Sequence, residues 1–296
     1  MKILIVGFGR MGVSHAFQIL GSLGSDTKIT VVDPSFLARI ISKLLLPQRI
    51  YYKNINDVEE KLFDFGVLCT PPYNRSFEVP IISRITKFCL IEKPVLTELP
   101  GNAMSGYVMQ YCPTVSYVSK LIRQQQLDIS AITINVQSNI DFSVGQSGWR
   151  SEDKAGGLLY EFFGHALTFG LSPMFYDSSF IFSNIVIKKS QKNVFEACFS
   201  VDGVSVRCHI YGDSNVRKTR YSCSYTIDGG SNIDFDPYSV TNKAKVINIP
   251  EIVPDIKFFL RAYEFSIQCD RLIAGSRDKM CSKGIRNIEN LLGDLV

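Results

Sequence analysis

The chain has 296 residues, of which 46% are hydrophobic. This length and this apolar content predict two domains of roughly 150 residues each, with a core in each. The 32 basic and 28 acidic residues are spread along the sequence and give a net charge of only +4, so no concentrated nucleic-acid-binding face is expected.

The opening apolar run, residues 3–6, is far too short for a signal-peptide core or a membrane span. The eight cysteines form no C-x-x-C pair and mostly lie in apolar runs, where a free thiol behaves as a small hydrophobic group. An even count also permits disulfides, but a long chain of intracellular character favours reduced cysteines. We therefore expect a cytoplasmic protein with no membrane partner.

Short buried strands alternate with helical stretches from the start to about residue 95, which is typical of a parallel sheet with crossover helices. Strands are expected at residues 2–6, 28–33, 66–70 and 88–91, and helices at 10–20 and 35–45. The pattern predicts an α/β Rossmann domain, a doubly wound parallel sheet, over residues 1–118.

Beyond about residue 128 the hydrophobic period shifts toward two, which indicates antiparallel strands. Strands are expected at residues 129–142, 180–188, 194–211 and 217–228, and helices at 156–172 and 255–274. Residues 119–296 are thus predicted to form an α+β domain with a large open, mostly antiparallel sheet that binds substrate and mediates oligomerisation. The helix at 255–274 is expected to pack on this sheet or back on the first domain.

A glycine-rich loop follows the first strand and opens the first helix, which is the context of a dinucleotide-binding fingerprint. It reads Gly7, Phe8, Gly9, Arg10, Met11 and Gly12. In this G-x-G-x-x-G pattern, the first glycine permits the turn, the second lets the backbone approach a pyrophosphate and the third allows close packing of helix on strand. The helix N-terminus then offers amides to the phosphates.

Asp33 ends the second predicted strand about 20 residues after this loop, where a carboxylate bonds the ribose 2′-hydroxyl and repels a 2′-phosphate. NAD is therefore favoured over NADP. The alternative is that Asp33 only caps the helix that begins near Ser35. His15, in the first helix, is interpreted as a packed histidine without a catalytic role.

Two further segments end predicted parallel strands, at the sheet edge where such folds bind ligands. One reads Cys69, Thr70, Pro71 and Pro72, and the other reads Glu92, Lys93 and Pro94. A lysine here can reach a nicotinamide and a substrate hydroxyl, although by spacing alone Lys93 could equally be a surface residue.

Together with the glycine loop, these segments resemble the Gfo/Idh/MocA oxidoreductases. The resemblance spans most of the chain and continues through Gly148, Trp149 and Arg150 into the glycine-rich stretch 156–165. It implies a nicotinamide cofactor between a Rossmann domain and an open sheet. Cofactor contacts are then expected from the loop residues, Asp33, Cys69, Thr70, Pro71, Glu92 and Lys93, and substrate contacts from Trp149 and Arg150.

The same resemblance assigns His165 as the general acid/base, Lys93 as the lysine of the family's E-K-P motif and Glu161 to the position of an aspartate. On a helix, residues 161 and 165 would leave one face a turn apart. Imidazole titrates near neutral pH, as removal of a hydroxyl proton during hydride transfer requires. The alternative for His165 is a satisfied core histidine.

We therefore predict an NAD(H)-dependent dehydrogenase or ketoreductase acting on a secondary hydroxyl or ketone of a sugar, nucleotide sugar or cyclitol. Two alternatives stay open: an NAD-dependent glycoside hydrolase of the same fold, and a catalytically degenerate protein that senses NAD or a sugar. Three positions depart from the family pattern: Arg75 where a histidine is common nearby, Glu161 for aspartate, and Thr168 for aspartate. The chain also looks short for the family, so trimmed strands or loops are expected.

Basic residues gather at two predicted strand ends in the second domain: Lys188, Lys189 and Lys192, and Arg217, Lys218 and Arg220. Solvated hairpin ends are the expected interpretation, with a phosphate-bearing substrate as the alternative. Ile181, Ile185 and Ile187 predict an apolar sheet face that needs a cover. A homodimer or homotetramer formed through this sheet is therefore expected.

Overall fold

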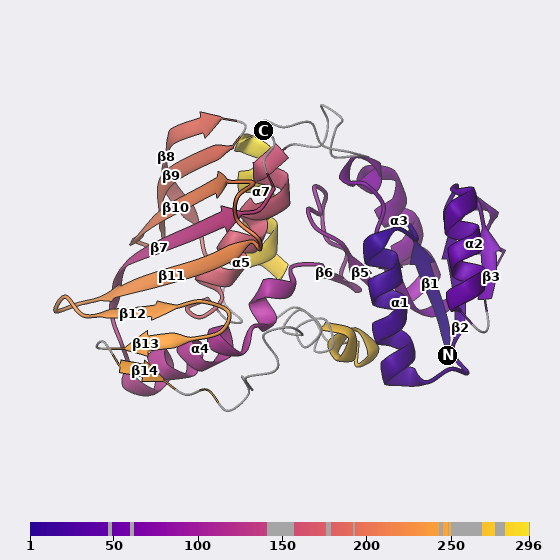
Figure 1. Ribbon diagram of the computed structural model, residues 1–296, viewed down its shortest axis with the longest axis horizontal. Helices are drawn as coiled ribbons and strands as arrows, with labels where there is room; N and C mark the ends of the chain where they lie inside the picture. Colours follow the sequence, from indigo (N-terminus) through magenta and orange to yellow (C-terminus); the bar gives the residue numbers. More distant parts are fainter. Residues whose placement is uncertain are drawn as a thin grey trace. The chain divides into compact units, whose positions relative to one another are not determined.

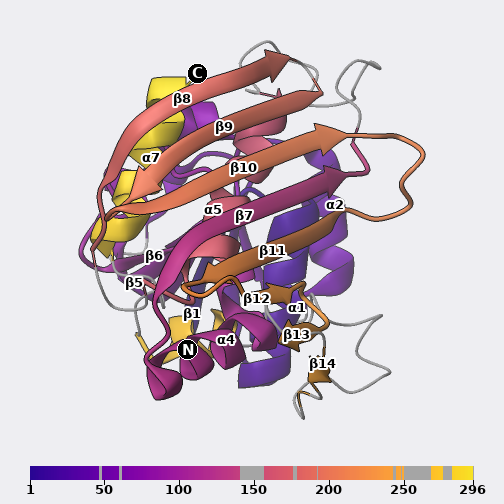
Figure 2. The ribbon, with the colours of Figure 1, turned by 90° about the vertical axis from the view of Figure 1, so that its left-hand side faces the viewer.

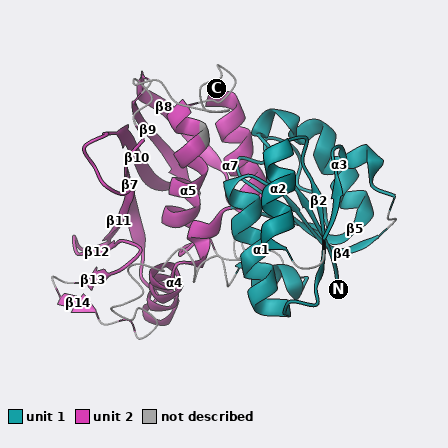
Figure 3. Ribbon diagram, turned by 45° about the vertical axis from the view of Figure 1, so that its right-hand side comes forward, with its two compact units in different colours: residues 1–106, 261–278 teal, residues 107–260, 279–296 magenta. Residues whose placement is uncertain are grey.

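A computed structural model describes all residues except 47–48, 60–61, 141–156, 176–178, 192, 243–244, 248, 250–267, 276–281 and 296. It divides the chain into two compact units (Figure 3). The first contains residues 1–106 and 261–278, and the second contains residues 107–260 and 279–296. The assignment of cofactor binding to the first unit and substrate binding to the second stays a prediction.

The first unit is built on a six-stranded sheet in the order β3-β2-β1-β4-β5-β6, with every neighbouring pair parallel. Its strands are β1 (Lys2–Val6), β2 (Lys28–Val32), β3 (Arg49–Tyr52), β4 (Phe63–Leu68), β5 (Thr86–Ile91) and β6 (Ala103–Ser105). The helices are α1 (Arg10–Leu23), α2 (Phe36–Leu45) and α3 (Arg75–Ile85), with 3₁₀ turns η1 (Ile55–Asp57) and η2 (Pro72–Asn74). This strand order confirms the predicted Rossmann sheet.

Strands β3 and β6 and helix α3 were not predicted. Strands β3 and β6 have only four and three residues, too few to show a period. Helix α3 contains Pro80, which removes a hydrogen-bond donor from its middle and hides the helical pattern.

The second unit carries an eight-stranded sheet in the order β14-β13-β12-β11-β7-β10-β9-β8. Its strands are β7 (Ile129–Ser138), β8 (Phe182–Gln191), β9 (Val194–Val201), β10 (Val204–Gly212), β11 (Arg220–Ile227), β12 (Asn232–Phe235), β13 (Val240–Asn242) and β14 (Lys245–Ile247). Only the pair β7 and β10 is parallel, so the mostly antiparallel sheet is confirmed.

The prediction of one strand over residues 194–211 was wrong, because β9 and β10 are separated by a tight turn. Asp202 and Gly203 in this turn have φ values of 48° and 88°. Two successive positive φ angles characterise the turn type that joins antiparallel strands with the correct twist.

Helices α5 (Gly164–Leu171) and α7 (Ser282–Leu295) lie on the same face of this sheet (Figures 1 and 2). The unit also contains η3 (Val108–Tyr111), α4 (Pro113–Gln125) and a π-helical segment, η6 (Leu159–Phe163), which runs directly into α5. Gly170 fits α5 against β7, because a Cβ there would lie 2.4 Å from Ile134 Cδ1. The hydroxyl of buried Tyr225 donates to the Gly170 carbonyl at 2.5 Å, which ties the helix to β11.

Residues 268–273 are helical and belong to the first unit, whereas the start of the predicted helix 255–274 lies outside the described residues. Ser22 of α1 donates to Asp270 at 3.4 Å, and Gln268 donates to the Ser105 carbonyl at 3.1 Å. The chain therefore returns to its first unit near its end. Among the described helices, none is long and apolar enough to cross a membrane.

Candidate active site

The glycine loop is fixed by the close approach of neighbouring backbone. Gly7 has φ +86°, and a Cβ there would lie 2.8 Å from the Cys69 carbonyl carbon. A Cβ on Gly12 would lie 2.1 Å from the Gly7 oxygen. Gly9 differs, because its Cβ would meet nothing within 4 Å. The protein itself thus requires glycine at positions 7 and 12, while glycine at 9 leaves free space above the loop.

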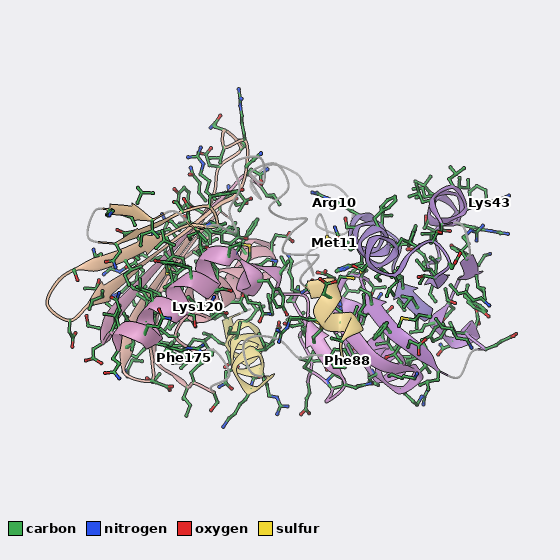
Figure 4. All side chains as sticks on the ribbon, turned by 90° about the horizontal axis from the view of Figure 1, so that it is seen from below. Arg10, Met11, Lys43, Phe88, Lys120 and Phe175 are labelled. Atoms are coloured by element: carbon green, nitrogen blue, oxygen red, sulfur yellow. The ribbon has the colours of Figure 1, made fainter. Side chains whose placement is uncertain are left out.

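Gly9 is also the N-cap residue of α1, and no side chain caps this end of the helix. The first-turn amides of α1 are therefore available to an anion, aided by the helix dipole. Arg10 and Met11 lie at the start of the same helix (Figure 4). Open space, uncapped amides and positive dipole together fit the pyrophosphate of a dinucleotide.

The carboxylate of Asp33 joins the glycine loop to the start of α2. One oxygen accepts from the Phe8 amide at 2.7 Å, and the other accepts from the Ser35 amide at 2.8 Å. The hydroxyl of Tyr51 donates to the backbone carbonyls of Asp33 and Ser35. Ser35 in turn caps α2 by accepting from the Ala38 amide at 3.4 Å. Asp33 thus supports the helix start, and its oxygens keep lone pairs with which to accept ribose hydroxyls.

The loop after β4 is held from inside by the first turns of α3. Arg75, only 2% exposed, donates to the carbonyls of Leu68 at 3.1 Å and Thr70 at 2.5 Å. The Thr70 hydroxyl donates to the carboxylate of Glu78, and burial raises the pKa of that carboxyl. The departure at Arg75 is therefore explained by the fold: its guanidinium supports the strand end that carries Cys69 and Thr70.

The segment after β5 is tied to the helix of the glycine loop. His15 Nε2 on α1 lies 2.7 Å from Glu92 Oε1, and both side chains are buried. The Lys93–Pro94 peptide bond is cis. Gly106 packs closely against this segment, because a Cβ there would lie 2.7 Å from the Glu92 Cα. The packed histidine predicted at position 15 thus has a specific partner that the sequence analysis missed.

In the second unit, His165 is 7% exposed and lies in the first turn of α5. The ring of Tyr107 meets it edge-on, with centroids 5.6 Å apart at 86°. The Tyr107 hydroxyl donates to the buried carboxylate of Glu289 on α7. A Cβ on Gly164 would lie 2.4 Å from this ring. Neither Tyr107 nor Glu289 was predicted as a site residue.

The other predicted site positions have different outcomes. Glu161 is half-buried in the π-helical segment, so the chain from 161 to 165 is not one regular α-helix as expected. Thr168 is buried and donates within its own helix to the carbonyls of Gly164 at 2.9 Å and His165 at 3.2 Å. Trp149 and Arg150 lie outside the described residues. The meeting of Lys93 and His165 at one site stays a prediction.

Comparison with solved structures finds full-length similarity to dehydrogenases. Apo scyllo-inositol dehydrogenase from Lactobacillus casei shares a TM-score of 0.73 at 13% identity, with 99% of this chain and 94% of that chain covered. WlbA (WbpB) dehydrogenase from Thermus thermophilus, in complex with NAD and UDP-GlcNAcA, gives 0.69 at 14% identity and the same coverage. The dehydrogenase MviM from Clostridium difficile gives 0.69 at 11% identity, covering 100% and 98%.

The chain has the fold of these dehydrogenases. The two-domain architecture implied by the sequence resemblance is therefore confirmed. The alignments cover 94 to 98% of these three chains. Strands or loops that are missing from this protein can therefore account for only a small part of their length. Searches against protein-family models and against curated proteins find no match.

Proposed function

We propose that the protein is a nicotinamide-dinucleotide-dependent dehydrogenase or ketoreductase that acts on a secondary hydroxyl or ketone of a sugar, nucleotide sugar or cyclitol. The observation that carries this proposal is the glycine loop, with open space above Gly9, uncapped α1 amides and Asp33 beside it. The inositol dehydrogenase and the UDP-GlcNAcA complex among the similar structures support a polyhydroxylated substrate.

When bound, the dinucleotide supplies the acceptor or donor of hydride. In the oxidative direction, His165 would take the proton of the substrate hydroxyl, and in reduction it would return one. Lys93 would stabilise negative charge that develops on the same oxygen. Glu161 would bond a neighbouring hydroxyl or orient these groups, and Tyr107 would hold the His165 ring by its edge-on contact.

We place this reaction in the cytoplasm, in a homodimer or homotetramer. The cysteines at positions 69, 89, 112, 198, 208, 223 and 269 are free, as a reducing compartment would keep them. Self-association is supported by the exposed side chains of Ile185 and Ile187 on β8 and of Ile181 just before this strand.

The test is hydride transfer followed by absorbance at the nicotinamide band, with inositols, sugars and UDP-sugars as substrates. We expect Lys93→Met and His165→Asn each to lower kcat roughly 100-fold or more while dinucleotide binding is retained. The matched controls are Lys87→Met, on β5 just before the segment that holds Lys93, and His209→Asn, a half-exposed histidine of β10. Both are expected to keep full activity. Dinucleotide binding without hydride transfer on any of these substrates would contradict the proposal. Hydride transfer that Lys93→Met leaves unchanged would contradict the role given to Lys93.

A further inference from the structure

The surface of the first unit has a hollow of about 380 Å³ that is lined by Arg39, Arg49, Tyr51 and Lys53. Arg39 comes from α2, Arg49 and Tyr51 come from β3, and Lys53 follows that strand directly. Alternate residues of an extended chain share one face. Arg49, Tyr51 and Lys53 therefore all lie on the face that borders the hollow.

Three cations therefore converge on one small space. Among the described residues, no carboxylate forms an ion pair with Arg39, Arg49 or Lys53. The Arg49 guanidinium lies over the Tyr51 ring, 5.9 Å from its centroid, which restrains its orientation. Like charges held together without a counterion favour the binding of an anion, and guanidinium groups fit phosphate oxygens in pairs.

The hollow borders the turn that is expected to hold the adenosine ribose. Tyr51, which lines it, bonds the carbonyls of Asp33 and Ser35 through its hydroxyl. The Asp33 carboxylate bonds the Phe8 amide in the glycine loop. In dinucleotide-binding sheets, the residue at the position of Asp33 contacts the ribose 2′-hydroxyl, and an arginine nearby accommodates a 2′-phosphate.

We propose that Arg39, Arg49 and Lys53 bind the 2′-phosphate of NADP(H), so that the protein binds NADP(H) at least as tightly as NAD(H). This inference rests on the dinucleotide-dependent function proposed above. Asp33 alone favours NAD, but the three cations that line the hollow outnumber its single negative charge.

The first test compares adenosine 2′,5′-bisphosphate with AMP, and NADPH with NADH, by calorimetry on the full chain. We expect the bisphosphate to bind at least tenfold more tightly than AMP, since each bond between a cation and a phosphate contributes about that factor. Its affinity should also fall more steeply with salt, because screening weakens exposed charge pairs.

The second test removes the cations one at a time as Arg39→Ala, Arg49→Ala and Lys53→Ala. At least one of them should weaken NADPH binding about tenfold and leave NADH binding within about twofold. Arg84→Ala is the matched control, because Arg84 is exposed on α3, which connects β4 to β5 on the other side of β1. All three target side chains reach solvent, so these variants should stay folded.

The outcomes separate this inference from the function on which it rests. NADH binding with much weaker NADPH binding would overturn the phosphate site and leave the proposed function standing. An equal loss of NADH and NADPH affinity in the variants would also overturn it, because the hollow would then contact the part that both cofactors share. Failure to bind either dinucleotide would overturn both proposals.

Discussion

Gly164 sets how closely Tyr107 can approach His165. In Gly164→Ala, the new Cβ would meet a buried ring whose hydroxyl is held by Glu289, so the ring cannot simply turn away. We expect a loss of about 1–3 kcal/mol in unfolding free energy, measured in urea. We also expect a fall in kcat of tenfold or more, because small displacements of catalytic groups are costly.

Gly293→Ala is the control for this change. Gly293 lies near the end of α7, and a Cβ there would meet nothing within 4 Å. Since alanine has the higher helix propensity, this variant should gain up to about 1 kcal/mol. If Gly164→Ala behaves like Gly293→Ala, then Tyr107 is not held against the helix as the structure indicates.

The sequence could predict those site residues whose requirement is local. Gly12 and Asp33 contact backbone within one βαβ unit, and Gly7 has its positive φ in the turn of that unit, so their spacing is enough to identify them. Tyr107 and Glu289 are bonded across 182 positions of sequence, and no local pattern links them. His15 and Glu92 are similarly 77 positions apart, so the sequence could indicate burial for each but not their pairing.

Helix α3 holds the loop that follows β4 through the side chains of Arg75 and Glu78. The contribution of Glu78 to stability depends on pH. Burial raises the pKa of Glu78 above its ordinary value near 4.5. The folded protein therefore binds more protons than the unfolded chain between that value and the raised pKa. Its stability should fall as the pH rises through this window, and the ionised carboxylate should oppose folding at neutral pH.

Glu78→Gln removes this cost and keeps an oxygen that can accept from Thr70. We expect it to raise the unfolding free energy at pH 7 by about 1 kcal/mol or less and to have little effect near pH 4. Asp64→Asn should act with the opposite sign, because a hydrogen bond from Lys87 lowers the pKa of Asp64. Stabilisation of equal size by Glu78→Gln at both pH values would exclude the titration of Glu78 as the cause.

The errors in predicting elements have physical causes. Asp202 and Gly203 form a tight turn inside a stretch that reads as one long alternating strand, because the apolar alternation resumes directly after the glycine. The aspartate-glycine pair was the signal that could have divided it. The π-helical turn at 159–163 leaves no comparable signal, since its contacts are with distant parts of the chain: α7, and Phe195 of β9 through the ring of Phe163.

For the whole molecule, alternation of strands and helices was enough to predict a Rossmann sheet, because parallel strands require crossover connections. The path of the C-terminal part could not be predicted in this way. An apolar helix face shows that residues 268–273 need a partner, but it does not say which unit provides one. The structure assigns these residues to the first unit, through Gln268 and Asp270.

Strand β8 forms one edge of the large sheet and is exposed along most of its length. Ile185 and Ile187 are 43% and 47% exposed, and Ile181 just before the strand is 67% exposed. The pairing of β8 with β9 shifts register at two points, and such irregularity disfavours the addition of another strand at this edge. We therefore expect the side chains of β8, rather than its backbone, to join two copies of the chain.

Light scattering on the purified protein should then give a mass of two or four chains. Ile185→Lys and Ile187→Lys together should shift this mass toward that of one chain, because burying two lysines in an apolar interface is costly. Val246→Lys is the control, since Val246 is 69% exposed on β14, at the opposite edge of the same sheet. A monomeric wild-type protein, or a mass that only Val246→Lys reduces, would show that β8 is not the interface.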